Sequence, residues 1–265
     1  MGDEAEYAYY QFYLREKLTP ERMREIFQAI VERNPSFTLS LGLEQLAELS
    51  YDINDYWRRH GGVDGPIGVI SKDGFEVRVL NVDNPHHFEN IEYTNPHIKR
   101  GERQLSIAFE PEDLYDVSST FINRVFDNPR IGLEMLPLIS TVASVSKAFL
   151  GIYGEEHHFE IRDPSKIWLR DIEYQQEILT QRGGEWGSFY FDDRLARDIG
   201  LDVLAEFAST MLRSDDGGCL VERFDIPLIG LGREPDSEVD ARKDRLFREH
   251  IVPKIIERLH AEYGI

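Results

Sequence analysis

Two glycine turns between alternating apolar segments constrain the fold of this chain most strongly. Lys72-Asp73-Gly74 separates residues 67–71 from 75–82, and Asp215-Asp216-Gly217-Gly218 separates residues 210–213 from 219–224. An Asp-Gly turn between two runs of period two is a strong β-hairpin signal. The second turn also predicts a glycine at positive φ and places the Cys219 thiol inside a sheet. The chain is therefore expected to contain antiparallel sheet.

Helical patterns alternate with the remaining strand patterns. Apolar alternation predicts further strands at residues 7–14, 37–41, 104–109, 152–161 and 185–191. Helical spacing predicts helices at 20–34, 43–60, 115–126, 136–150, 193–207 and 240–263. Thr19 is expected to cap the first of these, Asp192 or Asp193 the fifth, and Pro253 to kink the last. Residues 84–103 are polar and contain two prolines, which predicts a loop.

This mixture favours an α+β fold, mainly antiparallel sheet with packed helices, over a doubly wound parallel fold. The strand–helix–strand opening of the chain resembles the strand–helix–hairpin order later in the sequence. We therefore expect two halves of similar plan, 1–129 and 130–265, with a boundary near Pro129 and within one compact unit.

The net charge of −19 narrows the range of partners. A chain this acidic repels phosphate backbones, so nucleic-acid binding is disfavoured. Two explanations remain open. The acidity can serve solubility or a salty cytoplasm, since arginine outnumbers lysine 23 to 7. It can also attract a basic protein partner through long-range electrostatics.

The apolar segments and the single cysteine bear on localisation. No apolar run reaches the roughly 18 residues that a membrane span needs. The segment Met1-Gly2-Asp3-Glu4 lacks the basic flank and apolar stretch of a signal peptide. Cys219 is the only cysteine, so no internal disulfide can form. These features predict a cytoplasmic protein without membrane association.

Catalytic and cofactor motifs are not found in the sequence. The recognised zinc spacings, the glycine fingerprints for nucleotides and the serine-nucleophile elbow are all missing. Adjacent histidines in a strand point to opposite faces and cannot chelate together. The histidines considered are His86, His87, His97, His157 and His158. We expect no metal, no cofactor, an inert thiol at Cys219 and a protein that is not an enzyme.

Paired carboxylates are the remaining candidate site. In a chain with 49 acidic residues such pairs arise freely, and helix caps and solvated turns explain most of them. Their functional interpretation is a set of acidic loop residues that contact a protein partner. The candidate contact residues are Asp192, Asp193, Asp215, Asp216, Glu155 and Glu156.

Residues 165–260 carry an ordered series of motifs. Trp168-Leu169-Arg170-Asp171-Ile172 precedes Glu185-Trp186-Gly187-Ser188-Phe189-Tyr190-Phe191, and Leu195 to Ile199-Gly200 follows. The glycine turn Asp215–Gly218 and a closing helix with Pro253 complete the series. This order resembles the immunity proteins associated with type VI secretion and polymorphic toxins.

The resemblance implies a cytoplasmic protein that binds and neutralises a cognate toxin. Many such toxins are basic nucleases, which an acidic inhibitor would meet by charge complementarity. Two alternatives stay open: a hydrolase or transferase without a recognisable motif, using Glu155, Glu156 and the nearby histidines, and an acidic housekeeping protein of the haloarchaeal type.

Overall fold

The computed structural model describes residues 8–16, 19–39, 67–71, 76–80, 104–109, 129–155, 187–225, 228 and 238–263. The expected helices 43–60 and 115–126 and the expected loop 84–103 lie outside these residues. So do Glu156, the tryptophan-led motif at 168–172 and the five histidines considered as metal ligands.

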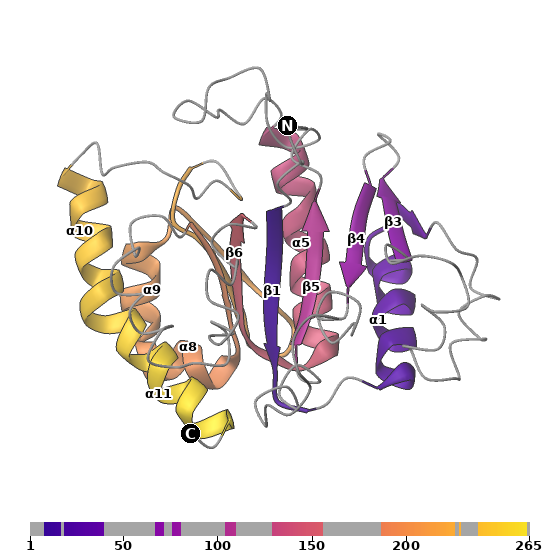
Figure 1. Ribbon diagram of the computed structural model, residues 1–265. Coiled ribbons are helices and arrows are strands. Elements are labelled where there is room, and N and C mark those ends of the chain that lie inside the picture. Colours follow the sequence, from indigo (N-terminus) through magenta and orange to yellow (C-terminus); the bar gives the residue numbers. More distant parts are fainter. Residues whose placement is uncertain are drawn as a thin grey trace, which may run out of the picture.

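The strands of the described residues form one antiparallel sheet, in the order β2-β3-β4-β5-β1-β6-β7-β9-β8 (Figure 1). The strands are β1 (Ala8–Leu14), β2 (Phe37–Leu39), β3 (Ile67–Ser71), β4 (Glu76–Leu80), β5 (Gln104–Phe109), β6 (Ala148–Glu155), β7 (Ser188–Phe191), β8 (Thr210–Arg213) and β9 (Cys219–Glu222). Both predicted hairpins are present, as β3–β4 and β8–β9.

Helices cover both faces of this sheet (Figure 1). On one face α1 (Pro20–Arg33) packs beside α5 (Pro129–Ser146). On the other lie α8 (Asp193–Ile199), α9 (Leu201–Phe207), α10 (Glu238–Leu246), the π-helical turn η4 (Phe247–Ile251) and α11 (Val252–Tyr263). The α+β class with mainly antiparallel sheet is therefore confirmed. No helix in the described part of the chain is long and apolar enough to cross a membrane.

The two predicted halves share this sheet. Strand β1 lies between β5 and β6, so it hydrogen-bonds to a strand of each half. A strand–helix–strand order occurs in both, as β1–α1–β2 and as β7–α8–α9–β8. The expected boundary at Pro129 falls on the first residue of α5, where proline is well tolerated because the first helical residue needs no N–H partner.

The predicted helix 136–150 is wrong at both ends, since α5 begins seven residues earlier, at Pro129, and also ends earlier than predicted. Helix α5 stops at Ser146, Lys147 adopts a left-handed φ of 58°, and Ala148 begins β6. The predicted strand 152–161 accordingly starts four residues earlier. An apolar run buried throughout does not distinguish helix from strand by periodicity, and this turn contains neither glycine nor proline to mark it.

Two further predicted helices are interrupted. Residues 193–207 form two helices because Gly200 adopts a φ of 103°, which separates α8 from α9. The last helix starts at Glu238 and contains η4, where the Val252 N–H donates to the Phe247 carbonyl five residues back. Pro253 follows at once, and its missing N–H accounts for this irregular turn in place of a regular α-helical ladder.

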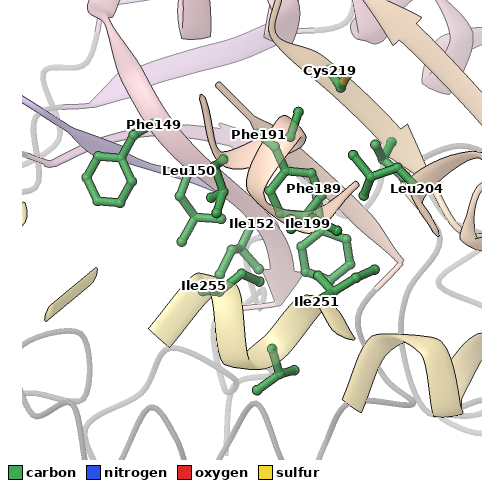
Figure 2. Packing of buried hydrophobic residues seen from close by; sticks show 14 of the residues in the cluster. Phe149, Leu150, Ile152, Phe189, Phe191, Ile199, Leu204, Cys219, Ile251 and Ile255 are labelled. Atoms are coloured by element: carbon green, nitrogen blue, oxygen red, sulfur yellow. The ribbon is translucent and has the colours of Figure 1, made fainter. Parts of the chain in front are cut away.

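The core beneath α8 to α11 is built from one face of the sheet. Figure 2 shows Leu150, Ile152 and Phe189 directed toward Ile251 and Ile255. The other face is dense with aromatic rings. A Cβ on Gly151 would lie 2.6 Å from Tyr10 Cε1 and 3.1 Å from Phe12 Cδ1, so only glycine fits between these rings.

A β-bulge breaks the alternation at the start of β6. Tyr13 pairs with Leu150 and Leu14 with Ala148, which leaves Phe149 as the extra residue. A bulge re-aims side chains. Phe149 accordingly belongs to the same cluster as Leu150 and has its ring 6.3 Å from that of Tyr13. It can thus meet α11, where the Arg258 guanidinium lies 5.6 Å above its ring.

Candidate functional site

Several chain segments meet at one end of the adjacent strands β1, β6, β7, β9 and β8. They enclose a charged cleft of about 430 Å³. They are the end of β1, the α5–β6 junction, the start of α8 and the β8–β9 turn, with the C-terminal part of α11 beside them (Figure 1). Its lining residues are Arg15, Ser144, Lys147, Ala148, Asp192, Asp193, Arg194, Arg197, Asp216, Arg258 and Glu262. We call this feature the edge cleft.

Asp192 is the buried anchor of the edge cleft. Its backbone is extended as the N-cap of α8, and its Oδ1 accepts a hydrogen bond of 2.6 Å from Leu195 N. Its Oδ2 accepts from Arg258 Nη2 at 3.2 Å and from Arg15 Nη2. The side chains of Asp192 and Arg258 are each 6% exposed, whereas that of Arg15 is 44% exposed. One carboxylate thus joins β1, α8 and α11.

The turn between β8 and β9 closes one side of the edge cleft. Gly217 has a φ of 88°, as the hairpin prediction required, and a Cβ there would lie 2.9 Å from Asp193 Oδ1. Asp216 Oδ1 accepts from Ser214 Oγ and from Gly218 N at 3.2 Å. Burial works to raise the pKa of Asp216, but these hydrogen bonds and one from Ser144 outweigh it and lower the pKa. Asp216 is therefore held as a carboxylate.

Tyr190 lies beneath this turn. Burial, followed by the nearby Asp216 carboxylate, raises the pKa of its hydroxyl. A Cβ on Gly218 would lie 2.7 Å from Tyr190 Cζ, so the turn rests directly on the ring. The Cys219 thiol is also buried, as predicted, and burial raises its pKa despite the nearby Arg213.

The structure places the predicted contact residues in three settings. Asp192, Asp193 and Asp216 line the same cleft, and Asp215 is exposed beside them in the turn. Asp192 has its oxygens occupied by internal partners, so it serves as a helix cap rather than as an exposed loop residue. Glu155 is at the far end of β6 from the residues that flank Asp192, because Leu150 pairs with Phe191. Glu156 lies outside the described residues.

Five cations of the edge cleft were not anticipated from the sequence: Arg15, Lys147, Arg194, Arg197 and Arg258. The Arg197–Asp193 ion pair has the spacing i, i+4 and could have been found from the sequence. No local pattern brings Arg15 and Arg258 to Asp192, since they lie 177 and 66 residues away from it along the chain.

A second polar cluster lies at the opposite end of strands β7 and β9, where Ser188 pairs with Glu222. Glu222 is buried, with Oε1 accepting from Ser188 Oγ at 2.5 Å and Oε2 accepting from Leu228 N at 3.0 Å. Burial raises the pKa of Glu222 to about 8, against the lowering effect of these two hydrogen bonds. Through its contact with Leu228 N, this carboxyl holds the left-handed Leu228, whose φ is 57°.

Metal binding finds no support in the described segments, where no group of three or more histidine, cysteine or carboxylate side chains is arranged to hold an ion.

Comparison with known proteins finds a likeness among solved structures and none among family models or curated sequences. No protein-family model matches the chain, and no curated protein matches its sequence. Among solved structures, the chain is similar to one described as "Pseudomonas aeruginosa T6SS protein PA0821". The TM-score is 0.41 and the identity 11%, over 97% of this chain and 83% of that one.

Proposed function

We propose that this chain is a non-enzymatic binding protein, an immunity-type inhibitor that neutralises a cognate basic toxin by protein–protein contact. The motif order of residues 165–260 motivates the family assignment. The partner's basic character is inferred from the charge of the chain, because a strongly acidic protein attracts basic surfaces over long range.

The observation that carries the proposal is the uneven distribution of acidic side chains among the described residues. Residues 187–225 contain nine acidic and four basic side chains, whereas each other described range has equal numbers of the two. The excess negative charge of the described structure is thus confined to β7, α8, α9 and the β8–β9 hairpin. Asp202 at the start of α9 and Asp215 and Asp216 in the turn are exposed members of this set. We call these three residues the acidic set.

Charge of this kind acts mainly on association. Attraction between exposed charges is screened over a Debye length of about 8 Å at physiological ionic strength. The association rate with the true partner should therefore fall steeply as salt rises, while the dissociation rate changes less. Replacing the acidic set by asparagine should slow association at low salt and leave the fold intact, because asparagine retains most capping and turn hydrogen bonds.

The test begins with capture of the partner from the native host on the immobilised chain at low salt, followed by purification of both proteins. Surface plasmon resonance then compares the wild type with D202N/D215N/D216N at two salt concentrations. The matched control is E21Q/E25Q/E32Q, which removes three exposed charges from the balanced helix α1. A slower association for the first variant alone supports the proposal, provided that the wild type also suppresses the partner's toxicity.

Two results would contradict it. Equal association rates for both variants would remove the acidic set from the interface and leave the charge to solubility. A captured partner that is not toxic to the host cell would reject the inhibitor function while leaving a binding role.

A further inference from the structure

The edge cleft has more hydrogen-bond donors than its own acceptors use. Each arginine carries five N–H donors and no acceptor, and lysine carries three donors. The Nε of Arg194, whose side chain is 68% exposed, lies 3.8 Å from Asp198 Oδ2. Lys147, left-handed and exposed, reaches Glu16 with its Nζ at 3.0 Å. The Nε of Arg258 is buried without an acceptor in the described part of the chain.

The acceptors of the edge cleft are largely occupied by partners within the fold. Asp192 is used by Leu195 N and two guanidinium groups, and Asp193 is used by Arg197. Asp216 accepts from Ser214 Oγ and Gly218 N, and Glu262 accepts from Arg258 at 2.7 Å. The hydrogen-bonding capacity that remains is therefore cationic, although the chain as a whole is strongly acidic.

We propose that the edge cleft binds a compact multivalent oxyanion, a small molecule that carries phosphate or several carboxylate groups. Guanidinium groups match both kinds of oxyanion in paired, charge-assisted hydrogen bonds. A volume of about 430 Å³ accommodates a small molecule of this class. This site adjoins the proposed partner contact, because Asp216 lines the cleft and also belongs to the acidic set. Its proposed ligand, however, would be bound by the cations of the cleft rather than by exposed acids.

Inorganic pyrophosphate and citrate are the probes. Both are compact multivalent oxyanions, the first carrying phosphate groups and the second carboxylate groups. Isothermal titration calorimetry on the full chain, at constant ionic strength, should give saturable binding of at least one probe. Thermal unfolding should shift upward with its concentration, as expected for a ligand of the folded state. Tighter pyrophosphate binding would assign a phosphorylated ligand, and tighter citrate binding a polycarboxylate.

The decisive variant is K147Q/R194Q, which removes two exposed cations and leaves the Asp192 network untouched. It should weaken binding about tenfold or more, the loss expected for hydrogen bonds to charged groups. The control R33Q/R245Q removes two exposed arginines elsewhere and gives the same net charge, so it should bind like the wild type. Absence of saturable binding for both probes in the millimolar range would overturn the proposal. So would an equal loss in both variants, which would indicate only a general charge effect.

Discussion

The Asp192 network allows a quantitative prediction for the variant D192N. Asparagine caps helices about as well as aspartate, so the hydrogen bond to Leu195 N should survive. The negative charge between Arg15 and Arg258 is lost. Hydrogen bonds to charged groups contribute about 1.5–3 kcal/mol each, and the Arg258 side chain, 6% exposed, cannot regain its bond from water. Glu262 remains as its other partner.

Because Arg15 is half-exposed, its ion pair with Asp192 contributes less to the free energy of unfolding than the Arg258 contact does. An ion pair with a half-exposed arginine contributes about 1 kcal/mol at most. Together the two contacts predict a loss of about 3 kcal/mol in the free energy of unfolding for D192N. D192A should lose about 1 kcal/mol more, because the cap is removed as well.

Urea unfolding followed by circular dichroism measures these losses, provided that the transition is two-state. The control is D193N, since Asp193 pairs with the exposed Arg197 at i, i+4 and should lose about 0.5 kcal/mol or less. If D192N is no more destabilised than D193N, the buried network does not stabilise the contact between α8, α11 and β1, and the reasoning fails.

Three further predictions test the packing and the buried groups. G218A should lower the free energy of unfolding by about 1–3 kcal/mol because the added Cβ meets the Tyr190 ring at 2.7 Å; if G218A unfolds at the same urea concentration as the wild type, the turn does not rest on this ring. The folded-state pKa of Glu222, about 8, lies above its ordinary 4.5, so the contribution of Glu222 to stability should be greatest below pH 4.5 and should fall by up to about 1.4 kcal/mol per pH unit between pH 4.5 and about pH 8. E222Q should flatten that part of the stability profile, and a profile unchanged by E222Q would assign the dependence to other groups. The Cys219 thiol should react slowly with a thiol reagent in the native state and fast in urea, since burial raises its pKa and excludes the reagent; equal rates would place it at the surface.

The sequence alone determined the elements that depend on local signals. The hairpin at Asp215–Gly218 follows from a turn chemistry that only glycine supplies, and Gly217 has the positive φ that it requires. The start of α1 follows from its N-cap Thr19, whose Oγ1 accepts a hydrogen bond of 3.2 Å from Arg22 N, three residues later. Strands 67–71, 104–109 and 210–213 were predicted at their observed bounds, because alternation over four to six residues is itself a local pattern.

The end of α5 could not be found in this way. Residues 136–150 are apolar on most sides, both as helix and as strand, so burial removes the periodicity that distinguishes the two. The change at Lys147 depends on β6 finding its place beside β1 and on the bulge at Phe149. These are contacts with a strand more than 130 residues earlier in the sequence.

The edge cleft also depends on tertiary structure alone. The aspartate pairs in the sequence favoured helix caps and turns over contact residues, but only the fold decides which carboxylate oxygens already have partners. Asp192 is buried because Arg15 and Arg258, from the two ends of the chain, converge on it. Local sequence patterns reach only a few residues, whereas the charge that a carboxylate meets is set by whichever segments the sheet order brings beside it.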